Sequence, residues 1–364
     1  MATELTTSPL STSSHGPTRG SDRSGTSSVE VHQTTPGTLV GADVIRPWWH
    51  TEATSWDRDA SHPASGDFDG DGIAEVASIV DDPSGGLQRL WVLGAGTDVR
   101  RLAWTSGEGG PIGASDLRVL AGDFDGDGLD DLVAFGDLAG SRTRVLWFPG
   151  SRDGLGEVVP VWDSGPGNWE LARTWLVAAD IEGDGDDEVV MLYQYDGGVV
   201  RLWAMPGTSD GPTTPRERWN SCQSCWEMER TRLAGGDLDG DGVDEVSMFY
   251  DYGGATSRWW AFSGADLADG GFPTAHLLWT SGIGQFDSSR ALYADADLEG
   301  DGTAEVVALY DYGIAHTRLW SFFLDRSGSA AVRLLYPPLA LPWGGGWATG
   351  APITMLQWDH ARLI

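Results

Sequence analysis

Basic residues, methionines and cysteines are scarce in this chain of 364 residues. Its 23 lysines and arginines face 54 aspartates and glutamates, which gives a formal charge of −31. A surface of this sign repels polyanions, so neither nucleic acid nor an anionic membrane surface is expected as the main partner. The chain also has no run of about 20 apolar residues, so we expect no membrane-spanning helix.

The only two cysteines are Cys222 and Cys225, too few for a disulfide framework. A single C-x-x-C without a second pair is a poor zinc site, and outside a βαβ unit it is a weak redox motif. We interpret the two residues as a local structural pair or as free thiols.

Residues 1–36 have little to bury, because serine, threonine and glycine dominate them. Such a segment cannot offset its ordering entropy, so we expect a disordered tail. The tail lacks the charged start and apolar run of a secretory signal peptide. Residues 37–364 are expected to form a single domain.

Glycine and tryptophan are abundant, with 51 and 19 residues, against only 6 methionines. This composition suits short strands and tight turns rather than a helical bundle. No segment sustains a helical apolar period between caps, and the apolar runs are four to eight residues long. The sequence therefore predicts an all-β fold.

A nine-residue acidic segment occurs five times. The first copy is Asp67-Phe68-Asp69-Gly70-Asp71-Gly72-Ile73-Ala74-Glu75, and the others begin at Asp123, Asp180, Asp237 and Asp297. Every copy has an acid at positions 1, 3, 5 and 9 and glycine at positions 4 and 6. A repeat of this length is the signature of a repeat architecture.

Two columns of tryptophan share the same period. One precedes the acidic segments, at Trp49, Trp104, Trp162, Trp219 and Trp279, and the other follows them, at Trp91, Trp147, Trp203, Trp260 and Trp320. We interpret each unit as four short strands, in this order: one with the first tryptophan, one entering the acidic loop, one leaving it, and one with the second tryptophan. Four-stranded units repeating about every 50 residues describe the blades of a β-propeller.

Residues beyond the five units bear on how the ring closes. Trp343 and residues 353–359 resemble the start of a sixth unit, and residues 29–31 and 39–40 are candidate partner strands. We expect six blades with the last shared between the termini, and five blades is the alternative.

Four carboxylates within nine residues repel one another unless a cation joins them. Oxygen ligands spaced two apart, with glycines that permit a tight reversal, favour a hard cation, and calcium accepts six to eight such oxygens. An EF-hand does not fit, because position 12 is not glutamate and the flanks are strand-like. We expect about five Ca²⁺ ions. The predicted ligands, including the backbone carbonyl at position 7, are Asp67, Asp69, Asp71, Ile73 and Glu75; Asp123, Asp125, Asp127, Leu129 and Asp131; Asp180, Glu182, Asp184, Asp186 and Glu188; Asp237, Asp239, Asp241, Val243 and Glu245; and Asp297, Glu299, Asp301, Thr303 and Glu305. Glu182 and Glu299 replace aspartate with a longer side chain, which is expected to weaken their sites.

The pattern D-F-D-G-D-G-x-x-E/D between two short strands resembles the calcium loop of FG-GAP repeats, also described as VCBS repeats. The resemblance covers residues 49 to about 325 and implies a propeller similar to integrin α-chain propellers and to bacterial and fungal propeller lectins. It implies structural calcium and an extracellular or cell-surface location. The family serves adhesion, sugar binding and some polysaccharide cleavage, so the resemblance is specific for fold and metal rather than for function.

No motif indicates a catalytic site. The histidines do not recur in register, and no G-x-S-x-G or H-E-x-x-H is present. We expect a non-catalytic module that binds a glycan or an extracellular protein. A polysaccharide-active hydrolase or lyase is the alternative, since paired acids need no motif, and a purely structural scaffold is the second. The oligomeric state stays open.

Tryptophans outside the two columns are candidates for stacking on a sugar ring, while the in-register ones are expected to fill the spaces between blades. Arginines two residues before the second tryptophan column are expected to pair with hairpin acids such as Asp251 and Asp311. The predicted ligand contacts are Trp175, Trp259, Arg173, Arg230 and Arg290.

Overall fold

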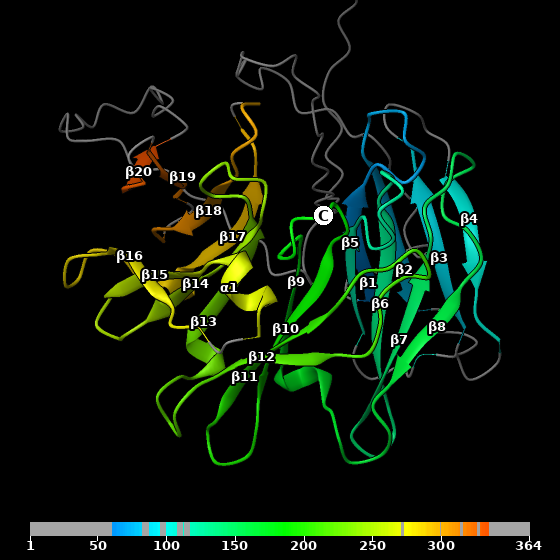
Figure 1. The fold of residues 1–364 in the computed structure, drawn as a ribbon, viewed down its shortest axis with the longest axis horizontal. Helices are drawn as coiled ribbons and strands as arrows, with labels where there is room; N and C mark the ends of the chain where they lie inside the picture. The colour runs from blue at the N-terminus through cyan, green and yellow to red at the C-terminus, as the bar shows by residue number, and fades with distance from the viewer. Residues whose placement is uncertain are drawn as a thin grey trace, which may run out of the picture.

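The computed structural model describes residues 60–334, except 82–86, 95–99, 108–111, 113–116, 271–272, 299, 314–315 and 326–327. Within these residues the chain forms five four-stranded antiparallel sheets, each a meander of consecutive strands (Figure 1). None of the helices in this part of the chain has the length and apolar character needed to cross a membrane. The fold is an all-β propeller of five blades. The sequence repeat predicts this fold class.

The strands follow the repeat closely, and the few helices are short. The strands are β1 (Ser61–Gly66), β2 (Glu75–Asp81), β3 (Gln88–Leu93), β4 (Arg100–Thr105), β5 (Leu117–Gly122), β6 (Asp131–Leu138), β7 (Arg142–Phe148), β8 (Val159–Asp163), β9 (Thr174–Ala179), β10 (Glu188–Gln194), β11 (Val200–Met205), β12 (Arg216–Asn220), β13 (Thr231–Gly236), β14 (Glu245–Asp251), β15 (Ser257–Phe262), β16 (His276–Thr280), β17 (Ala291–Ala296), β18 (Glu305–Asp311), β19 (Thr317–Leu324) and β20 (Ala330–Leu334). The helices are η2 (Leu171–Arg173), η3 (Met228–Arg230), α1 (Gly264–Ala268) and η4 (Ser288–Arg290).

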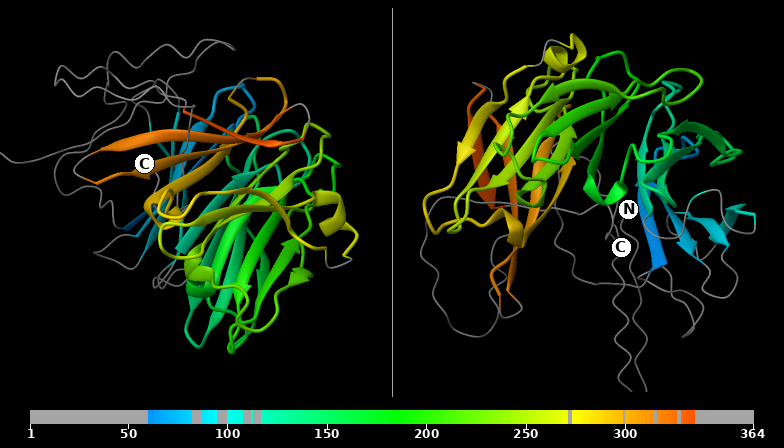
Figure 2. Two further views of the ribbon diagram at one scale, coloured as in Figure 1. Left: turned by 90° about the vertical axis from the view of Figure 1, so that its left-hand side faces the viewer. Right: turned by 90° about the horizontal axis from the view of Figure 1, so that it is seen from below.

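The blades are arranged around their first strands. The strands β1, β5, β9, β13 and β17 contact one another in that order. Figure 2 shows the sheets following one another along an arc from the blue first blade to the orange fifth blade. The apolar cores lie between consecutive blades, where the facing side chains of two sheets interdigitate.

Each blade has two ends of different composition. The first and second strands are joined by an acidic loop, and these loops define what we call the acidic-loop end. The second and third strands are joined by a turn at the opposite end, where the loops between blades also lie; we call this the hairpin end. The meander topology places all copies of one connection at the same end.

The predicted strand order is confirmed, but the frame of the unit shifts by one strand. Trp104 lies on β4 and pairs with β3 of the first blade, not with β5. The same holds for Trp162, Trp219 and Trp279, on β8, β12 and β16. The sequence does not decide this frame, because the repeat period is the same in either frame and the connections on the two sides of this strand can be equally long, as 149–158 and 164–173 are around β8.

Six blades are not supported. The described residues make five sheets of four strands, and the fifth is completed by β20. The segments considered for a sixth blade lie outside the described residues, as does the boundary between residues 36 and 37. The alternative of five blades is the one that the structure gives.

Candidate functional site

Three of the five acidic loops gather their aspartates into compact groups. In each group, one carboxylate oxygen of every residue lies within 4.8 Å of the others. The groups are Asp67, Asp69 and Asp71; Asp123, Asp125 and Asp127; and Asp237, Asp239 and Asp241. Convergent carboxylate oxygens of this kind are the donors that hard divalent cations prefer.

Backbone N–H groups fix the first carboxylate of each loop. Asp67 Oδ1 accepts a hydrogen bond from the N–H of Asp71 at 3.1 Å, and its Oδ2 accepts one from Gly72 at 2.9 Å. At positions 4 and 6 of the loop, Gly70 has φ 70° and Gly72 has φ 84°. A side chain is strained in this left-handed region, which explains why glycine stands at positions 4 and 6 of the loop.

The apolar residue at position 2 anchors the loop to the core, and the acid at position 9 closes it. Phe68 is fully buried, and its N–H donates to Glu75 Oε2 at 3.1 Å. The same bond to the ninth residue occurs in the other four loops. Each loop is thus closed by its own carboxylate before any ligand is added.

Burial and the neighbouring aspartates raise the pKa of several of these ninth residues. Burial, followed by the charge of Asp69, raises the pKa of Glu75 to about 7. Burial likewise raises the pKa of Asp131 to about 7 and those of Glu188 and Glu245 to about 8. A bound cation would offset the repulsion between the carboxylates of one loop. The donor set of the three convergent loops therefore fits calcium.

The third loop is built differently. Glu182 turns to Arg218, whose Nη2 donates to Glu182 Oε1 at 2.7 Å. Arg218 is buried, and its Nη1 also donates to the carbonyls of Leu267 and Ala268 in α1. The longer side chain therefore reaches an arginine instead of joining Asp180 and Asp184. That glutamate weakens metal binding at this loop stays a prediction.

The fifth loop is described only in part, because Glu299 lies outside the described residues. Asp297 makes the same backbone contacts as the first residue of the other loops. Glu305 also accepts a hydrogen bond from Arg333 Nη2 of β20 at 2.8 Å. The predicted carbonyl ligands stay predictions, namely Ile73, Leu129, Asp186, Val243 and Thr303.

Position 8 carries a contact between blades that the sequence interpretation missed. Asp187 accepts a hydrogen bond on Oδ2 from the N–H of Asp123 at 3.0 Å, and its own N–H donates to the Asp123 carbonyl at 2.6 Å. Asp130 and Asp244 hold the preceding loop in the same way. The signal was available, because aspartate recurs at this position in three consecutive units.

The two predicted tryptophan contacts lie in different surroundings. Trp259 is completely buried and stacks on Phe249, with ring centroids 5.6 Å apart, so protein covers its indole. Trp175 is partly buried on β9 and donates from Nε1 to the Met228 carbonyl at 2.9 Å. Arginines of the neighbouring blades flank it, with Arg118 Cζ 5.3 Å and Arg232 Cζ 5.8 Å from its ring.

The three predicted arginine contacts end the three short 3₁₀ helices at the hairpin end. Arg173 pairs with Glu170 at 3.2 Å and with Asp196 at 2.6 Å. Arg230 pairs with Glu227 at 2.8 Å. The guanidinium of Arg290 lies 5.7 Å from the ring centroid of Tyr310.

The in-register arginines have partners other than the expected hairpin acids. Arg258 lies over Tyr252 and Arg318 over Tyr312, rather than pairing with Asp251 and Asp311. Asp251 and Asp311 instead accept hydrogen bonds from backbone N–H groups of their own turns. The expectation was wrong because the turn itself satisfies these carboxylates.

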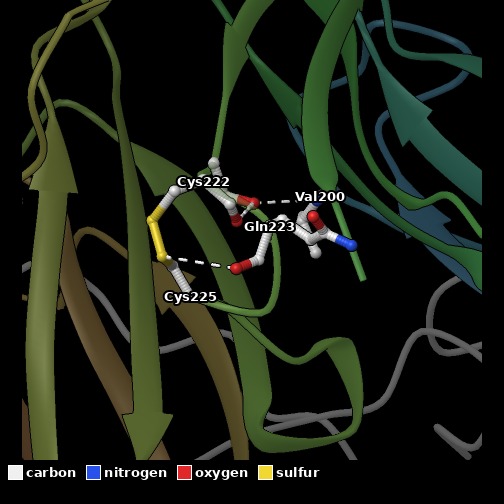
Figure 3. Close-up of a disulfide and its surroundings, with 5 residues drawn as sticks. Val200, Cys222, Gln223 and Cys225 are labelled. Carbon is white, nitrogen blue, oxygen red and sulfur yellow. Dashed lines mark hydrogen bonds between the residues drawn. A yellow bond between two sulfur atoms is a disulfide. The ribbon is translucent and has the colours of Figure 1, made fainter. Parts of the chain in front are cut away.

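Cys222 and Cys225 form a disulfide in the turn between β12 and η3 (Figure 3). Their Cα atoms are 5.3 Å apart, and the intervening Ser224 donates from N–H to the Gly198 carbonyl at 2.8 Å. The disulfide therefore closes a turn that covers the hairpin of the third blade. Of the two interpretations, the local structural pair describes it.

Comparisons with known proteins agree with this architecture. A family model described as an FG-GAP-like repeat matches residues 67–134 and 123–191. No curated protein matches the chain significantly.

Three solved structures that match the chain are similar to it at low identity. Rhamnogalacturonan lyase PL11 of Bacillus licheniformis is 16% identical, with 77% of this chain and 66% of that chain covered and a TM-score of 0.39. The chain thus spans slightly less than two thirds of the length of that lyase. The fungal lectin of Aleuria aurantia is 10% identical, with coverages of 77% and 79% and a TM-score of 0.44. The α-L-arabinanase of Penicillium chrysogenum is 10% identical, with coverages of 76% and 94% and a TM-score of 0.43.

The sequence repeat, the matching family model and the five sheets agree. The chain is a β-propeller, and its residues 67–191 match the FG-GAP-like repeat model.

Proposed function

We propose that this chain is a calcium-stabilised, non-catalytic binding module that acts outside the cytoplasm. The observation that carries the proposal is the convergence of three aspartates in each of three loops, with one oxygen of every residue within 4.8 Å of the others. These carboxylates would hold calcium. The ion would neutralise the negative charge that the fold concentrates in each of the three loops. Millimolar calcium outside cells suits sites made of few fixed ligands.

The expected contribution of the metal is large on the scale of protein stability. An ion that binds only the folded state adds about 2.7 kcal/mol when its concentration is a hundredfold above Kd. Domains are typically stable by only about 5–15 kcal/mol. Three such sites therefore supply much of the stability of the propeller.

The test is a thermal melt of the full chain in calcium chloride, in excess chelator and in magnesium chloride. We expect chelation to lower Tm by about 10 °C or more, since about 1 kcal/mol corresponds to a few degrees in a domain of this size. Magnesium should restore little of the loss, because it demands a tight octahedron. A melting curve that ignores the chelator would refute the calcium assignment, and release of reducing ends from polysaccharides at catalytic rates would refute the non-catalytic role.

A further inference from the structure

The hairpin end of the third, fourth and fifth blades carries one aromatic arrangement three times. In the fourth blade, Tyr252 packs edge-on against Tyr250 at 4.8 Å, and the guanidinium of Arg258 lies 4.5 Å from the Tyr252 ring centroid. Tyr252 is 41% exposed although it is a large aromatic residue. The ring is thus held in place by protein on two sides and open to solvent on another.

The other two blades reproduce this geometry closely. Arg201 lies 4.8 Å from the centroid of Tyr195, and Arg318 lies 5.0 Å from that of Tyr312. Their tyrosines pack against the neighbouring Tyr193 and Tyr310, at 4.7 and 4.6 Å. Tyr312 is 36% exposed. We call these pairs the Tyr–Arg sites: Tyr195 with Arg201, Tyr252 with Arg258, and Tyr312 with Arg318.

At each site a third aromatic ring, from the loop between blades, packs on the inner tyrosine. Trp169, Trp226 and Phe286 pack on the inner tyrosine of their site, at 4.2, 4.5 and 4.8 Å. The loop that carries Trp226 is the one closed by the disulfide. Rings fixed in this way lose little entropy on binding, which is what a preformed contact surface requires.

Blade architecture does not require the arrangement, because the second blade folds without it. Gly136 stands at the register of the inner tyrosine, and Leu138 occupies the position of the outer one. An added Cβ at Gly136 would meet Ile112, which fills the space that the aromatic rings occupy in later blades. The repeated rings in the last three blades therefore call for an explanation beyond the fold.

The charges around the sites indicate what kind of ligand fits. In the third blade Arg201 itself pairs with Glu217 at 2.7 Å. Nearby, Arg173 pairs with Glu170 and Asp196, and Arg230 pairs with Glu227, so carboxylates stand beside the guanidinium groups of the third and fourth blades. Such a surface, on a chain of charge −31, does not select anions. Within the part of the chain that the structure describes, Arg258 forms no ion pair and its guanidinium donates no hydrogen bond, so its donors stand free beside an exposed ring.

We propose that the three Tyr–Arg sites bind an uncharged saccharide built of repeated residues. The inference rests on the proposed binding function and names the ligand class. A sugar offers hydroxyls that both accept from arginine and donate to carboxylates, and apolar C–H faces that pack on an aromatic ring. Equivalent sites on consecutive blades match a ligand that repeats, and linked weak sites gain avidity without new contacts.

The experiment probes an array of neutral and acidic oligosaccharides with the full, calcium-loaded chain, and then measures affinity for the strongest neutral binder. The triple variant Tyr195→Ala, Tyr252→Ala, Tyr312→Ala should lose about tenfold or more in affinity, since one aromatic platform is worth about 1–3 kcal/mol and tenfold is 1.4 kcal/mol. Arg201→Gln, Arg258→Gln, Arg318→Gln is the second triple variant and keeps the rings in place. It should also weaken binding.

The matched control is Arg144→Ala, which alters the same register position in the second blade, where Gly136 replaces tyrosine. Its affinity should equal that of the unaltered chain, and the melting curves in calcium should show that every variant is folded. The inference is overturned if no neutral saccharide binds, if only acidic ones bind, or if both folded triple variants bind as well as the unaltered chain. If one of these results is found while chelator still lowers the Tm as expected, only the ligand assignment is overturned. If chelator leaves the Tm unchanged, the proposed calcium-stabilised function is overturned.

Discussion

The acidic-loop end and the hairpin end of this propeller are made by the same strands, but their repeats obey different rules. At the acidic-loop end all five units have the same acid and glycine pattern, yet the described structure gathers aspartates in three. At the hairpin end, the described residues place the Tyr–Arg sites in three consecutive blades. The acid and glycine pattern that all five loops share forms the backbone turn. Whether a loop can bind a metal depends also on which side chains the fold brings to it.

The third loop makes the difference concrete. It has the glycines, the backbone hydrogen bonds and the buried ninth acid of its neighbours. Arg218 nevertheless holds Glu182, and a guanidinium supplies a positive charge that calcium is expected to supply in the first, second and fourth loops. Loops that look equivalent in sequence are therefore expected to differ in metal binding.

The largest expected effect compares equivalent substitutions in two loops. Asp123→Asn replaces a charged carboxylate of a convergent group with a weaker, neutral amide oxygen and should abolish one calcium, at a cost of about 2.7 kcal/mol when calcium is a hundredfold above Kd. Asp180→Asn alters the same position of the third loop and should leave the calcium content unchanged. Metal analysis after dialysis, with melting curves in calcium, measures both. Loss of one calcium from each variant would show that Arg218 does not exclude the metal.

A smaller effect is expected where two acidic loops touch. Asp187→Ala leaves the N–H of Asp123 without its acceptor, which should cost about 1–3 kcal/mol. Asp187→Asn keeps an acceptor and removes a carboxyl whose pKa burial raises to about 8, so this variant should be as stable as the unaltered chain. Chemical unfolding in calcium compares the two. Equal stability of both variants would mean that the hydrogen bond contributes nothing.

The smallest expected effect lies at the hairpin end and depends on pH. Hydrogen bonds from Arg142, with both contacts at 2.6 Å, hold the pKa of Asp163 well below its usual range. A lowered pKa in the folded state stabilises the protein above the unfolded pKa of about 4, and this contribution is lost as pH falls further. Asp163→Asn should therefore melt slightly below the unaltered chain at pH 7, because partly exposed pairs are weak. The difference should shrink at pH 3, and a constant difference would assign it to packing.

Much of the fold was predictable because it depends on local pattern. The period of the acidic segments, the short apolar runs and the glycines at fixed positions are enough to predict four-stranded blades. The number of blades was not predictable in this way, because closure of the ring depends on which distant parts of the chain pair with one another. The frame of the blade was also missed, since a repeat has no natural starting point in sequence.

The candidate sites, too, were predictable only where they depend on local sequence. Asp67, Asp69 and Asp71 lie within one turn, so their convergence follows from spacing two residues apart on a loop that glycine allows to reverse. The burial of Trp259 was missed, because its neighbours Phe249 and Phe322 come from other strands, one of them in another blade. An out-of-register tryptophan is therefore not by itself an exposed one.

The sequence by itself determined the repeat, the strand-loop-strand unit and the oxygen-rich loops, since each is encoded within about ten consecutive residues. Only the tertiary structure decided that Arg218 reaches Glu182, that Asp187 holds Asp123, and that arginines stack on tyrosines at the hairpin end. The first two contacts join residues 36 and 64 positions apart, and the third depends on the turn that brings two strands side by side. Such contacts depend on which strands and loops the fold brings together, within a blade or between two, and a repeat pattern taken from the sequence does not contain that information.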